Sequence, residues 1–498
     1  MSSTVLLTII IISVYLLISV IISAGVARKY KMTTLADIFT ASKSLGVLAL
    51  CMAVFGAQIT AFSILGGPGL AYNLGYPTLG YVMGPVIAAP VAFFVIGYRV
   101  WVLSRKYNYL TPVQFFESRF ASGIPKYVMA VLQLILLVPY VLICGIGAGT
   151  ILSVMTDGLV PYSAGAFIIL LICSWTAYSG GMRGTAYTNI FQGILIFVVM
   201  FLMLFYTFKG IGGAEIIAGI NEKMISLGGQ GLQNPKMWIP YSLLATGLSN
   251  GVYAHILIRN MSADSPRTIK RNMILYPFLL GIFWSIAVLL GVWGSIAVPG
   301  LQGAATEDIV PLLAQKYAPA WMIGLLGAGI LATVMTTLDA LVLTMSSMFS
   351  EDLYKPLVYS RRTAEMTDKK QKNISQMFII IISVIVYILT LIKPASILSI
   401  GTFSFAGTAS LVPAYIACLY WKRATKEAVI TSALIGTVSS ALWAFEILPA
   451  SSTLGFFYGF PAFVLAAAAA VIVSLLSGKK DKSAENEFFS AFKDTYSS

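Results

Sequence analysis

A row of hydroxyl groups lies on one face of a predicted helix near residue 340. Its positions are separated by three, four and seven residues, the spacing that places side chains on one side of a helix. Hydroxyl and carbonyl oxygens are hard ligands that suit an alkali cation, and hydroxyls do not titrate near neutral pH. Each hydroxyl could instead bond the carbonyl four residues earlier and simply bend the helix. The small or hydroxylated positions of the row are Thr333, Thr336, Thr337, Ala340, Thr344 and Ser347.

A second polar cluster interrupts an apolar stretch nearer the N-terminus. Gln58, Thr60 and Ser63 occur close together there, and the run Gly66-Gly67-Pro68-Gly69 follows them. Interrupted membrane helices expose backbone carbonyls and helix ends, which bind ions and solutes at mid-membrane. We therefore predict an ion and solute site here; the alternative is a helix–helix contact made by small and polar side chains. A weaker signal of the same kind runs from Pro240 to Gly251.

One carboxyl group, that of Asp339, lies deep within an apolar segment. Because burying its charge is costly, an intramembrane carboxylate indicates a function by default. It could bind a cation or exchange a proton. The structural alternatives are an ion pair and a carboxyl that stays protonated.

Few other residues could support catalysis or bind a metal. The chain has a single histidine, His255, and its four cysteines lie in apolar stretches without a CxxC spacing, which argues against a zinc site and a disulfide framework. No GxxxxGK[ST] phosphate loop occurs, so active transport would have to use an ion gradient. No nucleophile, base and metal site occur together, and we expect no enzyme activity.

The composition is that of a membrane protein. Of 498 residues, 58% are hydrophobic and 10% are charged, and the mean hydropathy is +0.87, whereas soluble domains carry about 25% charged residues. The net charge of +13 could suggest a nucleic-acid partner, but Lys and Arg stand in short clusters between apolar runs and not along one basic face. We therefore predict a lipid bilayer as the surroundings and no nucleic acid as a partner.

Thirteen membrane-spanning helices account for the apolar stretches at about 20 residues a crossing. With the N-terminus outside, 27 Lys and Arg residues fall in inner segments and five in outer ones, as the positive-inside rule requires. We predict an all-α integral membrane protein with one transmembrane domain over 1–478, the C-terminus inside, and a charged, disordered cytoplasmic tail over 479–498. The predicted spans are 5–24, 46–72, 78–98, 127–155, 161–179, 186–208, 238–257, 273–297, 321–348, 375–392, 396–420, 428–447 and 456–477.

Several sequence blocks resemble the sodium:solute symporter family, and within it the proline and pantothenate permeases. The blocks follow the family's order along nearly the whole chain, and this common order carries the resemblance. They are Asp37-Ile38-Phe39 with Lys43-Ser44-Leu45-Gly46; Gly66-Gly67-Pro68-Gly69 with Ala71-Tyr72; Thr111-Pro112 with Phe116-Glu117-Ser118-Arg119-Phe120; Gly180-Gly181-Met182-Arg183 with Thr188-Asn189 and Gln192; His255-Ile256-Leu257 with Arg259, Met261 and Ala263-Asp264-Ser265; and Met335-Thr336-Thr337-Leu338 with Glu351-Asp352-Leu353-Tyr354-Lys355.

The resemblance implies a core of ten helices in two inverted repeats of five, over about 46–420, with one helix before the core and two after it. It also implies a co-transported sodium ion, bound by the carbonyls of Gly56, Ile59 and Thr333 and by the hydroxyls of Thr336 and Thr337. The solute would lie beside the same helix break. Its implied contacts are Gln58, Thr60 and Ser63, together with Tyr76, Tyr140, Tyr241 and Tyr253.

Two departures from the family pattern affect these expectations. Proline permeases carry Asp where this chain has Gln58, which leaves the solute open among an amino acid, pantothenate and a short carboxylate. Members with a second sodium site carry Asp at the position of Asn189 and hydroxyl residues where Asp339 and Ala340 stand. A second cation site at Asn189 and Asp339 therefore stays an alternative, and we favour a single sodium.

Together these residues predict a multi-pass plasma-membrane protein that imports a small polar organic solute with sodium by alternating access. Two alternatives stay open: proton coupling through Asp339, and a transporter-like sensor or passive channel. A sensor would be expected to carry a cytoplasmic signalling domain. The sequence gives no indication of oligomeric state.

The charge distribution makes the orientation testable. In intact cells, a membrane-impermeant thiol reagent should label a cysteine that replaces Ser3 but not one that replaces Glu485, because only the N-terminus lies outside. The reverse labelling pattern would contradict the predicted orientation.

Overall fold

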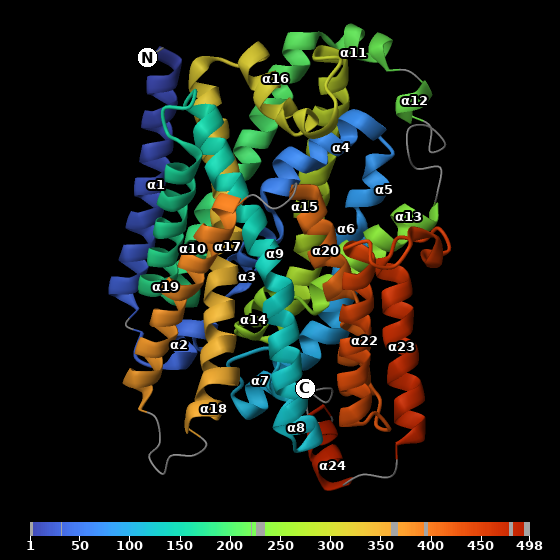
Figure 1. Ribbon diagram of the computed structural model, residues 1–498. Coiled ribbons are helices and arrows are strands. Elements are labelled where there is room, and N and C mark those ends of the chain that lie inside the picture. The colour runs from blue at the N-terminus through green and yellow to red at the C-terminus, as the bar shows by residue number, and fades with distance from the viewer. Residues whose placement is uncertain are drawn as a thin grey trace.

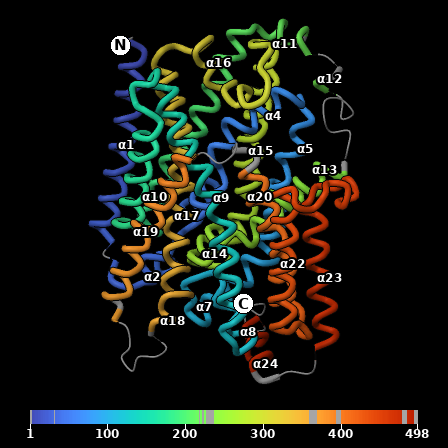
Figure 2. Tube along the Cα trace, viewed as in Figure 1, coloured from blue at the N-terminus to red at the C-terminus, as the bar shows by residue number. Residues whose placement is uncertain are grey.

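The computed structural model describes residues 3–30, 32–220, 222–225, 235–359, 367–392, 397–477 and 482–492. Apart from one isolated bridge between Leu45 and Ala263, the regular elements of these residues are helices (Figures 1 and 2). The long helices are α1 (Ser3–Lys29), α9 (Gly123–Met155), α10 (Tyr162–Ile211), α15 (Pro266–Ala297), α17 (Ala320–Met348), α19 (Asp368–Ile392), α22 (Lys426–Ala444) and α23 (Gly459–Leu476). The shorter helices are α2 (Leu35–Thr40), α3 (Val47–Gln58), α4 (Gly67–Leu74), α5 (Thr78–Val82), α6 (Gly84–Ala92), α7 (Tyr98–Tyr107), α8 (Gln114–Phe120), α11 (Gly213–Gly219), α12 (Glu222–Ile225), α13 (Pro235–Pro240), α14 (Ala254–Met261), α16 (Ile309–Tyr317), α18 (Lys355–Tyr359), α20 (Ile397–Ala409), α21 (Val412–Tyr420) and α24 (Lys482–Ser490).

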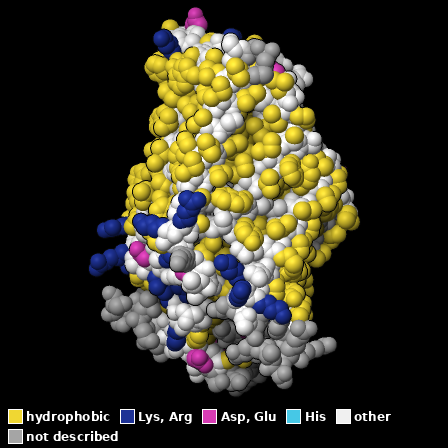
Figure 3. Space-filling view, turned by 90° about the vertical axis from the view of Figure 1, so that its left-hand side faces the viewer, with side chains coloured by type: hydrophobic (Ala, Val, Ile, Leu, Met, Phe, Trp, Pro, Cys, Tyr) yellow, Lys and Arg dark blue, Asp and Glu magenta, His cyan; other side chains and the backbone are white. Residues whose placement is uncertain are grey.

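Many of these helices can cross a membrane. Within the described ranges, ten are long and apolar enough, or eleven when the bent pair Val47–Gln58 and Phe62–Leu74 counts as one span. Figure 3 shows a broad band of apolar side chains on one face, with Lys and Arg gathered below it. We call this lower end, where α8 and α24 lie in Figure 1, the inner end, following the predicted orientation. The prediction of an all-helical, multi-pass membrane protein is confirmed.

Two segments account for the difference between these eleven spans and the thirteen that were predicted. The helix α10 has 50 residues, about 75 Å if it were straight, whereas a bilayer core is about 30 Å thick. Gly181 interrupts it with φ 52° and ψ −152°, a conformation open to glycine, and the predicted spans 161–179 and 186–208 lie on either side. The predicted span 238–257 consists of short helical pieces. The number thirteen, the inverted repeat and the sidedness stay predictions.

Both helices that were predicted to be interrupted are broken. The helix α3 ends at Gln58, and Ile59 has extended backbone angles. A π-helical turn over Phe62–Gly66 leads into α4, and the segment Phe62–Leu74 is bent by 67° relative to α3. In the second case, a π-helical turn over Tyr241–Gly247 and a 3-10 turn over Leu248–Gly251 separate α13 from α14.

The two broken helices are joined at the inner end. Leu45, just before α3, pairs through its backbone with the residues after α14: its N–H donates to the Ser262 carbonyl (3.0 Å) and its carbonyl accepts from the Asp264 N–H (3.1 Å). Arg183, just after the interruption of α10, donates to the Ser44 hydroxyl at 2.8 Å. The start of α3 is therefore fixed to α14 and α10.

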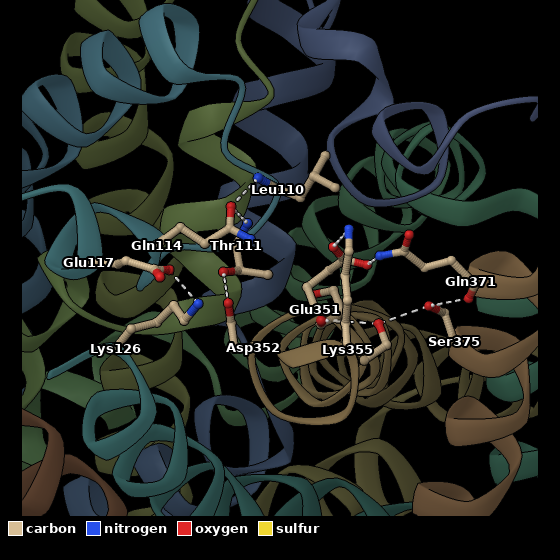
Figure 4. A network of polar contacts seen from close by, with 12 residues as sticks. Leu110, Thr111, Gln114, Glu117, Lys126, Glu351, Asp352, Lys355, Gln371 and Ser375 are labelled. Carbon is tan, nitrogen blue, oxygen red and sulfur yellow. Dashed lines mark hydrogen bonds and ion pairs between the residues drawn. The ribbon is translucent and has the colours of Figure 1, made fainter. Parts of the chain in front are cut away.

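A polar network joins the inner ends of other helices (Figure 4). The Thr111 hydroxyl, before α8, donates to the buried Asp352 carboxylate at 2.9 Å, in the π-helical turn that continues α17. In the same turn, the Glu351 carboxylate accepts from the Gln371 amide of α19. Two sequence blocks that resemble the family thus meet in space and tie α17 to its neighbours.

The tail does not match the sequence-based expectation. The disorder predicted for 479–498 is wrong for 482–490, which form α24 against α8; the residues 478–481 and 493–498 lie outside the described ranges. Phe488 is fully buried, the Arg119 guanidinium lies 4.9 Å from the Phe489 ring centroid, and that of Arg99 lies 4.5 Å from the Phe492 ring centroid. Aromatic burial and cation–π contacts offset the cost of ordering this charged segment.

This docking predicts a local effect of Phe488→Ala. Because truncating a buried phenylalanine removes about 3–5 kcal/mol of packing, the amides of α24 should exchange with deuterium much faster than in the native protein. The matched control is Asn486→Ala, since Asn486 is exposed on the same helix. Equal exchange in the two variants would contradict the docking.

Candidate ion and solute site

Three backbone carbonyls converge on one hydroxyl group at the break after α3. The Thr337 Oγ1 atom lies 3.2 Å from the Gly56 carbonyl oxygen, 2.9 Å from that of Ile59 and 3.2 Å from that of Thr333. The Thr336 hydroxyl also donates to the Thr333 carbonyl, at 2.9 Å. A hydroxyl has one proton, so the Thr337 hydroxyl can donate to only one of the three carbonyls at a time, and of the three the Thr333 carbonyl also accepts from Thr336. The five residues predicted to bind sodium are brought together.

The break frees the carbonyl of Gly56 at the end of α3. In a continuous helix the Gly56 carbonyl would accept the N–H of Thr60, but that N–H donates to the Ser63 hydroxyl (3.3 Å). The Thr60 hydroxyl in turn accepts from the Phe62 N–H (3.2 Å). Thr60 and Ser63 therefore satisfy the backbone of the break, in addition to any role toward a solute.

Two other hydroxyls of the row, those of Thr333 and Ser347, bond only within α17, whereas the buried Thr344 hydroxyl has no partner among the described residues. The Thr333 hydroxyl donates to the Ile330 carbonyl (2.7 Å), and that of Ser347 donates to the Thr344 carbonyl (2.8 Å), within the same helix. Thr337 differs because its hydroxyl reaches across to α3. The spacing in the sequence predicted the row of hydroxyls. Within this row, Thr337 is distinguished by its contacts with the carbonyls of Gly56 and Ile59.

Small residues allow α17 and α9 to approach the break. A Cβ atom added to Gly56 would lie 3.0 Å from the Thr336 Cβ, and one added to Gly147 of α9 would lie 2.6 Å from the Ala61 Cβ. A larger side chain at either position would push the break away from the helix that packs on it.

A cavity lies beside the break. Four of the predicted solute contacts, Gln58, Thr60, Ser63 and Tyr241, line it. None of the lining residues is charged. The others are Phe62, Tyr81, Val82, Pro85, Thr246, Trp284 and Phe405.

The remaining predicted tyrosines are placed elsewhere. The rings of Tyr140 and Tyr253 stack on each other with centroids 5.5 Å apart, and Tyr140 contacts the cavity residue Phe405 edge-on at 5.7 Å. They form a layer behind the cavity wall. The Tyr76 hydroxyl instead accepts from the Trp293 indole at 3.3 Å, away from the cavity lining.

Asn189 and Asp339 are both buried, but no hydrogen bond joins them. One oxygen of Asp339 accepts from the Thr176 hydroxyl at 2.9 Å, and the other has no partner among the described residues. Both amide atoms of Asn189 also lack a partner in these ranges, and its Nδ2 would lie 3.5 Å from a Cβ at Gly56. Asn189 of α10 therefore borders the cluster of carbonyls, whereas Asp339 of α17 is hydrogen-bonded to Thr176 of α10.

Known proteins resemble this chain in sequence and in fold. The sequence profile of the sodium:solute symporter family matches residues 38–436. This chain belongs to the sodium:solute symporter family. Its members are membrane transporters that carry out symport, so the chain is a transporter and not an enzyme.

Individual relatives agree with the family. The High-affinity proline transporter PutP of Bacillus subtilis (strain 168) is 27% identical over 458 residues, covering 86% of this chain and 93% of the relative. The Sodium/pantothenate symporter of Haemophilus influenzae is 25% identical over 431 residues, covering 83% and 85%. The structure of a Na+-coupled sialic acid symporter in a substrate-bound outward-open state is similar in fold, with a TM-score of 0.78, 16% identity and coverage of 95% and 98%.

The close approach at Gly56 gives a stability prediction. Gly56→Ala should lower the melting temperature of the purified protein by an amount that corresponds to about 1–3 kcal/mol, because the new methyl group overpacks against Thr336. Gly281→Ala is the matched control, since its methyl group would meet Val86 at an ordinary 3.7 Å. Equal melting temperatures for the two variants would show that α3 and α17 are not in close contact.

Proposed function

We propose that this chain couples the entry of sodium to the import of a small polar organic solute by alternating access. The observation that carries the proposal is the convergence of the Gly56, Ile59 and Thr333 carbonyls on the Thr337 hydroxyl. In this proposal a sodium ion is attracted by the partial negative charge of these oxygens. It binds to them and to the oxygen of the Thr336 hydroxyl. The sodium coupling of the family and the proline and pantothenate symporters among the relatives support it.

The geometry also suggests how the ion and the solute are coupled. Gln58, which lines the cavity, lies between Gly56 and Ile59, whose carbonyls face the ion. Sodium holds the broken helix against α17 and so stabilises the conformation in which the cavity accepts solute. By linkage, bound solute strengthens sodium binding to the same extent.

The finer topology belongs to the same proposal. Thirteen spans, two inverted repeats of five helices within about 46–420, an outer N-terminus and an inner C-terminus fit the broken helices and the gathering of Lys and Arg at the inner end. The plasma membrane is the proposed location, since an inward sodium gradient across it would drive import into the cell.

One sodium accompanies each solute in this proposal. The second candidate is coupling to a further cation or a proton at Asp339, favoured by its carboxylate oxygen that has no partner among the described residues. Against it, Asp339 and Asn189 share no hydrogen bond, and the Thr176 hydroxyl already occupies the other oxygen.

Uptake into proteoliposomes tests the function. Labelled L-proline, pantothenate and N-acetylneuraminate are offered under an inward sodium gradient, an inward potassium gradient and an inward proton gradient. The proposal requires accumulation of at least one solute above its outside concentration with sodium only. Accumulation driven by protons alone would favour Asp339 as the coupling group, and flux that ignores every gradient would indicate a channel.

The sodium site makes a prediction about three threonines. Thr336→Ala and Thr337→Ala should each raise the sodium concentration for half-maximal uptake by about tenfold or more, since each removes an oxygen ligand worth roughly 1.5 kcal/mol. Thr344→Ala, on the same row but outside the cluster of carbonyls, should change it little. Coincident sodium activation curves for the three variants would refute the site.

The stoichiometry can be measured from reversal potentials. The native chain and Asp339→Asn should both move one sodium with each solute, because Asp339 does not contribute a ligand. A native ratio of two cations for each solute that falls to one in the variant would identify Asp339 as a ligand of a second site.

A further inference from the structure

Trp284, on α15, has a buried indole N–H without a partner among the described residues. Other tryptophans of the chain satisfy theirs: Trp101 donates to the Ala263 carbonyl at 3.0 Å, and Trp443 donates to the Ser452 hydroxyl at 2.8 Å. A buried donor that is left unpaired costs free energy and calls for an explanation. Trp284 is not among the residues that were predicted from the sequence to contact the solute.

Trp284 belongs to the wall of the cavity. Trp284 lines it together with Gln58, and the Trp284 side chain is 6% exposed. Its benzene edge is held against Gly67, where an added Cβ would lie 2.5 Å from Cζ3, and its ring meets that of Phe62 at 6.3 Å. These contacts restrict the rotation of the indole.

The chemistry of the wall restricts what can bind there. An indole N–H can only donate, whereas the Gln58 amide can donate and accept, and the Gln58 Oε1 atom also lacks a partner in the described ranges. No lining residue carries a charge, and the aromatic rings of Tyr81, Tyr241 and Phe405 form much of the remaining wall. A solute must supply an acceptor to Trp284, a second polar group to Gln58 and a compact apolar body.

We propose that the Trp284 indole N–H binds a carboxylate oxygen of the transported solute, and that Gln58 binds a hydrogen-bond donor of the same molecule. This inference rests on the proposed function. A carboxylate is favoured over a neutral carbonyl because a hydrogen bond to an ionised acceptor is stronger, and the sodium ion at the adjacent break balances its charge without a basic side chain. The solute class is then a small monocarboxylate that also carries an amine or hydroxyl group.

The test compares carboxylates with the corresponding alcohols. The probes are L-proline with L-prolinol and pantothenate with pantothenol, each competing for sodium-driven uptake in proteoliposomes. For at least one pair, the native protein should prefer the carboxylate by about tenfold or more. Trp284→Phe should abolish this preference, while the thermal stabilisation of the solute-free protein by NaCl over KCl stays unchanged. Trp443→Phe, which loses an indole hydrogen bond outside the cavity, should keep it.

Several outcomes would overturn the assignment. They are equal use of the alcohols by the native protein, an unchanged preference in Trp284→Phe, and uptake of neither carboxylate. If Trp284→Phe does not fold, Trp284→Tyr serves in its place. The comparison of the carboxylates with the alcohols on the native protein tests carboxylate recognition without either variant. Thermal stabilisation of the purified protein by NaCl over KCl separates the two failures. If it persists, only the role of Trp284 is wrong; if it is absent, the proposed sodium coupling fails as well.

Discussion

The organisation of this transporter depends on one local constraint, the interruption of a membrane helix after Gln58. Backbone groups inside a bilayer must be satisfied within the protein, and here the Thr60 and Ser63 side chains satisfy the N–H groups of the break. The carbonyls of Gly56 and Ile59 are thereby left for the Thr337 hydroxyl. The proposed cation site and the cavity proposed for the solute lie on two sides of the same interruption.

The surrounding helices fix the position of α3, the helix that ends at this interruption. Glycine at position 56 lets α3 lie directly against α17, and the backbone pairing of Leu45 with Ser262 and Asp264 fixes its start to α14. The Asp352 network fixes the inner end of α17 to the segment before α8. The alternating access proposed above would therefore move the broken helix together with the segments that are bound to it.

Much of this could be predicted from the sequence, because interrupted helices carry glycine and polar residues at visible places. The hydroxyl row and the polar cluster indicated the residues that the structure brings together, although their roles remain predictions. Trp284 and Phe405 could not be found in this way, since an aromatic residue in an apolar segment also fits a lipid-facing or core position. The order of α24 was missed because its phenylalanines, such as Phe488, act through arginines far away in the sequence.

The use of backbone carbonyls at the break has an evolutionary consequence. A carbonyl oxygen is common to every residue type, so exchange of the Ile59 side chain need not remove its proposed contribution to the ion site. Gln58, whose carbonyl does not face Thr337, contributes its side chain to the cavity. Under the proposed function, its exchange would alter solute preference while the coupling ion is retained. In this proposal, solute preference depends on side-chain atoms and ion binding on backbone atoms of the same helical turn. Substitutions could therefore change the transported solute during evolution while sodium coupling is kept.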